Sequence, residues 1–214
     1  MVRGMISAVI PAYNEGGTVG EVVSETLKYV DEVWVVDDGS EDDTCEKASQ
    51  SGAQVIRQKH EGYIQAIRRG VTASQGDIIV TLDADCEHNP SEIPLLVGPL
   101  TAGEADLVLG SREKIPSFSE RMIGWLVRVQ IPVRDHGTGF RAMTRELAVN
   151  LDIMGSCTCG TLVLEAYLKG ARIVEVPVTI KNVEKKRRRK WNHICQLWYV
   201  VHLLLLIRKR NQKE

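Results

Sequence analysis

Three acidic side chains alternate along one short segment, directly after a strongly apolar stretch. Residues 78–82 read Ile-Ile-Val-Thr-Leu, and Asp83, Asp85 and Glu87 follow at every second position. Hard cations such as Mg2+ and Mn2+ bind carboxylate oxygens together with substrate phosphates, and the ion neutralises charge on a departing diphosphate. Without a cation or a cluster of donors, three carboxylates this close would raise one another's pKa. The segment therefore predicts a metal and phosphate site, with a solvated acidic turn as the alternative.

Two adjacent carboxylates, Asp37 and Asp38, follow another apolar stretch. They come directly after residues 33–36 and precede Gly39-Ser40. Asp, Gly and Ser favour turns and helix caps, so a purely structural turn is one interpretation. Asp-Asp is unusual for a cap alone. One carboxylate can accept a hydrogen bond from a nucleobase N–H while the other accepts from local backbone donors.

The first apolar stretch, residues 5–10, leads into Pro11-Ala12-Tyr13-Asn14-Glu15-Gly16-Gly17. This segment lacks the Gly-x-Gly-x-x-Gly spacing that lets a backbone wrap a pyrophosphate, which disfavours a dinucleotide-dependent dehydrogenase. Tyr13 and Glu15 have the chemistry to stack on a base and to hydrogen-bond it. An ordinary turn between a strand and a helix is the alternative.

The elements that would position these residues follow a simple alternation through about residue 112. Short apolar stretches alternate with longer amphipathic ones, which is typical of strands joined by crossover helices in a parallel sheet. Because ligands bind beyond the carboxyl ends of such strands, the acidic and aromatic residues above would meet at one edge. Gly52, Gly70 and Gly76 lie where helices are expected to end. The predicted strands cover residues 5–10, 32–36, 54–57, 77–82, 106–110 and 172–176, and the predicted helices cover 17–29, 42–51, 61–74, 91–102, 118–130 and 160–169.

Charge divides the chain into two parts. Residues 184–214 carry ten Lys or Arg and two Glu, whereas the first 183 residues hold 17 basic and 26 acidic side chains. We expect one catalytic domain over residues 1–183 and an appendage over 184–214. A nucleic-acid binder would not combine an acidic domain with a basic tail in this way, so no nucleic-acid partner is predicted. The five cysteines are an odd number and no secretory signal precedes them, which predicts a reducing, cytoplasmic compartment.

The appendage has the pattern of a membrane-surface helix. Six Lys or Arg at residues 185–190 precede an apolar stretch of about 17 residues, 191–207, that polar residues such as Gln196 interrupt. A spanning helix needs about 20 mostly apolar residues, so an amphipathic helix lying on an anionic membrane is predicted. A helix packed on the catalytic domain is the alternative.

The remaining motifs give weaker signals. Cys157-Thr158-Cys159 has no partner at zinc-finger spacing, and the five histidines form no recognisable ligand pattern. No Gly-x-Ser-x-Gly elbow points to a Ser/His/Asp hydrolase.

Four motifs occur in an order and spacing that are far more specific than any one of them. They read Ile-Pro-Ala-Tyr-Asn-Glu at 10–15, Val-Asp-Asp-Gly-Ser at 36–40, Asp-Ala-Asp at 83–85 and Asp-His-Gly-Thr-Gly-Phe-Arg at 135–141. Over about residues 6–180 the chain thus resembles family 2 glycosyltransferases, specifically the polyprenyl-phosphate sugar transferases that include dolichol-phosphate mannose synthase. The resemblance implies an α/β GT-A fold: a Rossmann-like, mixed, mostly parallel sheet with helices on both faces, here with a C-terminal amphipathic helix.

The resemblance also implies a donor site. Its nucleotide-binding residues would be Pro11, Ala12, Tyr13, Glu15, Asp37, Asp38, Asp83, Ala84 and Asp85. Asp83 and Asp85 would bridge a Mg2+ or Mn2+ ion and the diphosphate. Relatives commonly carry Gln at the position of Glu87, so Glu87 is a third candidate ligand that adds negative charge. The segment His60-Glu61-Gly62-Tyr63 departs from the family's Gly-Lys-Gly-like stretch.

On the acceptor side, Gly110-Ser111-Arg112 matches the family's Gly-Ser-Arg, and the implied phosphate ligands are Arg112, Arg121, Arg141 and Arg188. Guanidinium groups meet phosphate oxygens with two parallel donors. Asp135 would line this side, which makes Asp83, Asp85, Arg112 and Asp135 the expected catalytic set. For a hydroxyl acceptor, Asp135 or Glu165 would be the natural general base, whereas a phosphate acceptor is already ionised.

By resemblance, the chain is expected to transfer a hexose from a nucleotide diphosphate sugar, of the GDP-mannose or UDP-glucose type, to a polyprenyl phosphate such as dolichyl phosphate. The reaction would invert the anomeric carbon, need a divalent metal, and take place at the cytoplasmic face of a membrane. One alternative is a transferase that acts on a sugar or lipid hydroxyl. Another is a catalytically silent module that binds nucleotide or lipid at a membrane.

Overall fold

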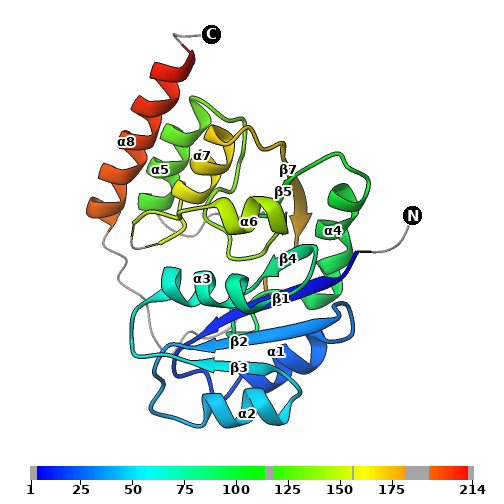
Figure 1. The fold of residues 1–214 in the computed structure, drawn as a ribbon. Coiled ribbons are helices and arrows are strands. Elements are labelled where there is room, and N and C mark those ends of the chain that lie inside the picture. The colour runs from blue at the N-terminus through cyan, green and yellow to red at the C-terminus, as the bar shows by residue number, and fades with distance from the viewer. Residues whose placement is uncertain (1–3, 114–117, 156, 182–192, 212–214) are drawn as a thin grey trace.

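The computed structural model of the 214-residue chain describes residues 4–113, 118–155, 157–181 and 193–211 (Figure 1). Its strands are β1 (Ile6–Ala12), β2 (Glu32–Asp37), β3 (Gln54–Arg57), β4 (Ile78–Thr81), β5 (Leu107–Arg112), β6 (Arg141–Thr144) and β7 (Ile173–Val178). Its helices are α1 (Val19–Thr26), α2 (Thr44–Gln50), α3 (Tyr63–Ala73), the 3-10 turn η1 (Pro90–Glu92), α4 (Ile93–Thr101), α5 (Phe118–Arg128), α6 (Arg145–Asn150), α7 (Thr161–Leu168) and α8 (His193–Asn211).

The strands form one mixed sheet in the order β3-β2-β1-β4-β6-β5-β7. Neighbouring strands pair in parallel except β6, which runs antiparallel to both β4 and β5. The predicted mixed, mostly parallel α/β sheet is confirmed, and all six predicted strands are present with ends within two residues of those expected. β6 is a seventh strand that the sequence did not predict, because its four residues include Arg141 and do not form the apolar stretch of an interior strand.

Side chains of the sheet alternate between two apolar clusters, one on each face. Ala8 and Ile10 of β1 join the cluster beneath α1 and α4, whereas Val9 joins the cluster that α3, α5, α6, α7 and α8 cover. Figure 1 shows α3 and α6 on one side of the sheet and α1 and α2 on the other. Helices therefore cover both faces, as predicted, and the carboxyl ends of the strands remain for a site.

The parallel strands β1, β2 and β4 end at the same edge of the sheet. Ala12 pairs with Asp37 across β1 and β2, and Val9 pairs with Thr81 across β1 and β4. The backbone N–H of Asn14, after β1, donates to Oγ of Ser40, after β2, at 2.8 Å. Sγ of Cys86, after β4, donates to the carbonyl of Thr18 at 3.8 Å. The sequence motifs after these strands consequently lie together.

Gly70 does not end a helix, contrary to the prediction. It lies inside α3, where an added Cβ would come within 2.3 Å of Cγ1 of Val9 in β1. The glycine therefore lets α3 approach the sheet closely, and the helix ends three residues later at Ala73. Gly52 follows α2 as predicted and has a positive φ of 97°.

Helix α8 packs along one face against the rest of the fold, chiefly against α7 and α5. Gln196, Val200, Leu203 and Ile207 are all at most 2% exposed and recur every three or four residues. Figure 1 shows α8 beside α5 and α7, and Nη1 of Arg210 donates to the carbonyl of Leu168 at 2.6 Å. Among the described helices, none is both long enough and apolar enough to cross a bilayer.

Candidate active site

The carboxylates of Asp83 and Asp85 lie just beyond the end of β4, both partly exposed. Oδ1 of Asp83 accepts a hydrogen bond of 3.4 Å from the hydroxyl of Tyr63, at the start of α3. Oδ1 of Asp85 accepts from the backbone N–H of Glu87 at 3.1 Å, and Cys86 between them has a positive φ of 62°. This tight turn keeps both carboxylates at the sheet edge.

Gly139 lies directly against Asp83 and limits what fits there. A Cβ added at Gly139 would come within 2.5 Å of Oδ2 of Asp83, a distance that real contacts do not reach. Its carbonyl accepts from Oγ1 of Thr81 at 2.8 Å, which fixes the loop before β6 over the end of β4. Only a glycine therefore fits this close to the carboxylate of Asp83.

His88 is a residue of this site that the sequence analysis missed. It is 5% exposed, its ring stacks on Phe140 with centroids 5.2 Å apart, and its Nε2 lies 3.5 Å from Oδ2 of Asp83. Among the described residues neither ring nitrogen has a hydrogen-bond partner. The only signal was its position one residue after the acidic run, and a histidine there can orient a metal-binding carboxylate.

The described residues contain no ready group of three His, Cys, Asp or Glu side chains around a metal position. The chemistry of the donor set still fits Mg2+ or Mn2+, because such ions often take one or two protein carboxylates and complete their shell with phosphates and water. Asp83 and Asp85 supply those carboxylates. Ligation by Glu87, whose carbonyl accepts from the backbone N–H of Lys181 at 2.9 Å, stays a prediction.

Asp37 and Asp38 are both buried and both hold loops of the site. Oδ1 of Asp37 accepts from the backbone N–H of Ser40 at 2.9 Å, as expected for local capping. Oδ1 of Asp38 accepts from Nε2 of Gln58 at 2.7 Å and from the backbone N–H groups of Glu61 and Gly62. The backbone N–H of Gly62 and Nδ1 of His60 also lie within 3.1 Å of Oδ2 of Asp38, and a contact between Asp38 and a nucleobase stays a prediction.

His60, which the sequence analysis did not assign to the site, contacts both Tyr13 and Asp38. The rings of Tyr13 and His60 have centroids 4.3 Å apart, and Nδ1 of His60 lies 3.0 Å from Oδ2 of Asp38. Glu15 is fixed nearby, since its backbone N–H donates to Oγ1 of Thr44 at 2.8 Å. Of the other predicted nucleotide ligands, Pro11 and Ala12 are buried at the end of β1 and Ala84 is buried after β4.

Arg112 and Asp135 form a two-point ion pair at the end of β5. Nε of Arg112 lies 2.6 Å from Oδ2 and Nη2 lies 2.8 Å from Oδ1 of Asp135, which is 1% exposed. The backbone N–H of Arg112 also donates to Oδ2 at 3.0 Å. Burial alone would raise the pKa of Asp135, but the hydrogen bonds and charge of Arg112 outweigh it and hold that pKa below its usual range.

Glu165 points to a different part of the fold. Its carboxylate accepts from the backbone N–H groups of Asp152 and Ile153, the latter at 2.8 Å, and so fixes the loop after α6. Burial raises the pKa of Glu165, although these two hydrogen bonds oppose the shift. Its hydrogen bonds to this loop account for its burial without a proton-transfer role.

The predicted acceptor arginines lie in different environments. Arg121 is exposed on α5, whereas Arg141 is 1% exposed on β6 and donates from Nη2 to Oγ1 of Thr158 at 2.8 Å. Nε of Arg141 has no hydrogen-bond partner among the described residues. Arg188 lies outside the described residues.

Comparisons with known proteins agree with this geometry. Residues 7–158 match the family model described as Glycosyl transferase family 2. A dolichol-phosphate mannosyltransferase of Pyrococcus furiosus is 32% identical over 81% of this chain and 56% of its own length. An undecaprenyl-phosphate 4-deoxy-4-formamido-L-arabinose transferase of Shewanella sediminis is 30% identical over 66% of this chain and 49% of its own length. The chain thus spans about half the length of these relatives.

Similar solved structures include glucosyl-3-phosphoglycerate synthase of Mycobacterium tuberculosis in complex with Mn2+, UDP-glucose and phosphoglyceric acid. That structure has a TM-score of 0.77 and 28% identity, and covers 95% of this chain and 79% of its own. A second structure of the same synthase, with Mg2+ and UDP, has a TM-score of 0.75 and 26% identity.

Proposed function

Because the chain belongs to glycosyltransferase family 2, we propose that it transfers a hexose from a nucleotide diphosphate sugar to a polyprenyl phosphate, with inversion at the anomeric carbon. The observation that carries the proposal is that Asp83, packed against Gly139, and Asp85 follow β4 at the edge where β1, β2 and β4 end. This edge is where a parallel sheet binds its ligands.

The donor half follows from the residues gathered at this edge. Tyr13, Asp38 and His60 offer a ring surface and an acceptor for a nucleobase. Asp83 and Asp85 would hold a Mg2+ or Mn2+ ion, which would offset the charge of the departing diphosphate. Solved relatives that contain such an ion with UDP or UDP-glucose support this assignment.

The acceptor side of the site, around Arg112 and Asp135, is better suited to a phosphate than to a hydroxyl. A hydroxyl acceptor needs a general base, but Asp135 is tied to Arg112 with its pKa held low and Glu165 is turned toward the amides of residues 152 and 153. A phosphate monoester is already ionised and needs only positioning and charge compensation. Arg112, which Asp135 holds in place at the end of β5, would position the phosphate. The names of the two relatives point to dolichol phosphate and undecaprenyl phosphate as acceptors.

A second candidate acceptor is a small phosphorylated acid. The observation that favours it is the likeness of nearly the whole chain to a glucosyl-3-phosphoglycerate synthase crystallised with phosphoglyceric acid. The two acceptors share a phosphate group, so Arg112 alone does not separate them. Their difference lies in the long apolar chain of the prenyl phosphate.

A direct assay tests the proposal. GDP-mannose and UDP-glucose would each be incubated with the full chain, Mn2+, and either dolichyl phosphate, undecaprenyl phosphate or 3-phosphoglycerate. We expect a glycosylated prenyl phosphate with one of the donors and none without Mn2+. A product with 3-phosphoglycerate alone would establish the second candidate, and donor binding with no transfer to any acceptor would support a silent binding module.

We also propose that α5 and α8 place the enzyme on the cytoplasmic face of an anionic membrane. Both helices expose apolar side chains that are between 42% and 68% exposed: Met122 and Trp125 on α5 with Val129 directly after it, and Trp198, Val201 and Leu205 on α8. The two helices pack side by side through buried residues on their other faces. Exposed Arg208, Lys209 and Arg210 end α8, and basic residues beside apolar side chains suit anionic headgroups.

Vesicle binding should weaken in two distinguishable ways. Replacing Trp198 and Leu205 with Ala removes apolar burial, whereas replacing Arg208, Lys209 and Arg210 with Gln removes charges that contribute about 1 kcal/mol each near the surface. We expect only the charge variant to make the remaining binding less sensitive to salt, because screening acts on charges. Cosedimentation with phosphatidylserine vesicles over a salt series measures both. Lys47→Gln on α2, far from α8 in Figure 1, is the control for charge removal, and equal losses in all three variants would contradict the assignment.

A further inference from the structure

Gln196 is a fully buried polar residue on the face of α8 that packs against the rest of the fold. Its Nε2 donates to the carbonyls of Cys157 at 2.8 Å and Cys159 at 3.0 Å, and it lies 3.1 Å from Oγ1 of Thr161. Its Oε1 accepts from the backbone N–H of Cys157 at 3.4 Å. One side chain thus fixes the backbone on both sides of Thr158.

Two glycines show how closely α8 and this segment fit. Gly155 has a φ of 104°, and an added Cβ would come within 2.4 Å of Oε1 of Gln196. Gly160 has a φ of 77°, and its Cβ would come within 2.9 Å of Ile123 in α5 and 3.4 Å of Val200 in α8. The backbone at Gly155 therefore fits against α8, and the backbone at Gly160 fits against both α5 and α8.

Thr158 connects this segment to β6, the strand that pairs with β4. Its Oγ1 accepts from Nη2 of Arg141 at 2.8 Å, and Arg141 pairs with Thr81 two residues before Asp83. The segment also contacts the loop that carries Asp135, the partner of Arg112. The backbone N–H of Gly160 donates to the carbonyl of His136, which follows Asp135. Both routes end at residues that the sequence and the fold assign to the site.

We infer that Gln196 is a positioning residue, which holds Thr158 and through it Arg141 in the arrangement needed on the acceptor side. The inference rests on the proposed function, which identifies this part of the site as the acceptor side. Under this inference α8 has two roles, because the helix that we place on the membrane also donates the hydrogen bonds that hold the segment around Thr158. The carbonyls of Cys157 and Cys159 accept the N–H donors of Gln196, so removing this amide would leave the backbone on both sides of Thr158 without those partners.

Arg141 is the residue on which this positioning acts. Arg141 is 1% exposed, none of the ion pairs among the described residues includes it, and its Nε has no hydrogen-bond partner there. A buried cation of this kind is costly unless its position is fixed and an anion can approach it. Losing the Thr158 hydroxyl or its backbone support should therefore disturb the acceptor step more than donor binding.

The test compares Gln196→Ala with Thr158→Val, which keeps the shape of Thr158 but removes its hydroxyl. Each is expected to lower kcat/KM for a short-chain prenyl phosphate about tenfold, with the Kd of the donor nucleotide unchanged. The double variant should lose little more than either single variant, because both act on one linkage. Thr158→Ser restores the hydroxyl and should restore activity. His202→Ala, on the exposed side of α8, should retain full activity on the same soluble acceptor.

Hydrogen exchange supplies a measurement that does not depend on transfer. The amides of residues 157–161 should exchange faster in Gln196→Ala than in the unmodified chain, while those of β1 stay protected. Unchanged exchange there, additive losses in the double variant, or an equal loss of donor affinity would overturn the positioning role. If the unmodified chain transferred sugar to no prenyl phosphate, the proposed function would fall, and the exchange measurement would still decide whether Gln196 fixes this segment.

Discussion

Asp85→Asn is expected to abolish sugar transfer while leaving the fold intact. The asparagine carbonyl can still accept the hydrogen bond from the backbone N–H of Glu87, so the turn after β4 should form as before. A neutral amide oxygen is a much poorer ligand for Mg2+ or Mn2+ than a carboxylate. The loss of charge beside the diphosphate should lower kcat by about 10³-fold or more.

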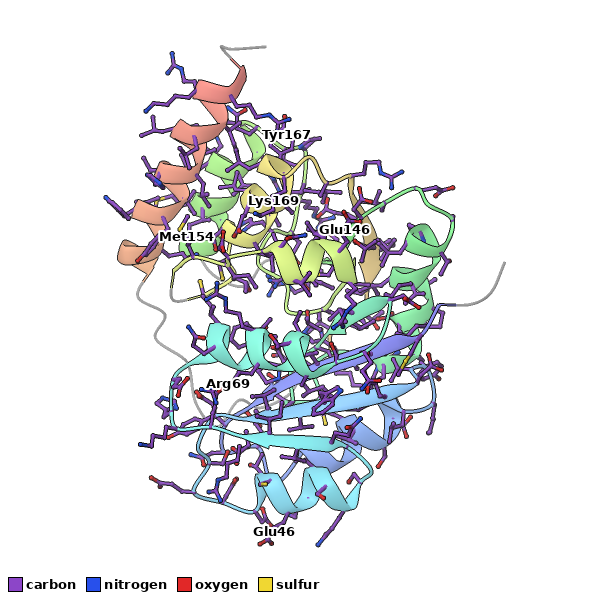
Figure 2. The ribbon with its side chains drawn as sticks, in the orientation of Figure 1. Glu46, Arg69, Glu146, Met154, Tyr167 and Lys169 are labelled. Carbon is purple, nitrogen blue, oxygen red and sulfur yellow. The ribbon has the colours of Figure 1, made fainter. Side chains whose placement is uncertain are left out.

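The measurement is a transfer assay across a Mn2+ series, accompanied by thermal unfolding. Glu46→Gln is the matched control, because it removes one carboxylate charge from the outer surface of α2, as Figure 2 shows, at a residue with no part in the proposed site. That control should retain full activity. Normal turnover in Asp85→Asn at every Mn2+ concentration would show that the metal is not held at Asp85.

Gly139→Ala is expected to have the second-largest effect. The new methyl group would lie 2.5 Å from Oδ2 and 2.8 Å from Cγ of Asp83, so the carboxylate must turn away. Thr81 would still donate to the carbonyl of residue 139, and the loop should keep its course. A misplaced ligand of this kind should lower kcat by about 10² to 10³-fold and weaken Mn2+ binding.

The control for this substitution is Gly98→Ala in α4, where an added Cβ meets nothing within 4 Å. It introduces the same methyl group without a clash and should retain full transfer activity. Calorimetric titration with Mn2+ in the presence of the nucleotide separates the two variants. Equal Mn2+ affinity in Gly139→Ala and the unmodified chain would contradict the role assigned to Gly139.

The sequence predicted the parallel half of the sheet and the acidic site because their signals are local. Apolar stretches such as residues 78–82 identify strands by themselves, and the carboxylates that follow them must lie at the strand ends. Asp83 and Asp85 could therefore be placed together with Asp37 and Asp38 before any coordinates. The tail was harder: its apolar stretch fits both a membrane surface and a packed helix, and α8 packs through one face and exposes apolar residues on another.

The residues that the sequence analysis missed depend on contacts between distant segments. β6 is short, contains Arg141, and becomes a strand only because β4 and β5 lie on either side of it. His88 gains its meaning from Asp83 and Phe140, and Gln196 from a backbone segment about 40 residues earlier. No periodicity or spacing within the chain encodes these contacts.

The place of β6 in the sheet also bears on how a growing chain folds as it leaves the ribosome. β4 ends at Thr81 and β5 at Arg112, but the strand that joins them begins only at Arg141. Until that strand has been synthesised, two strand edges stay unpaired, and such edges are templates for aggregation. Gly139 arrives with the same strand and closes over Asp83 when it pairs. For a nascent chain, joining β4 to β5 and bringing Gly139 against Asp83 are therefore one late event.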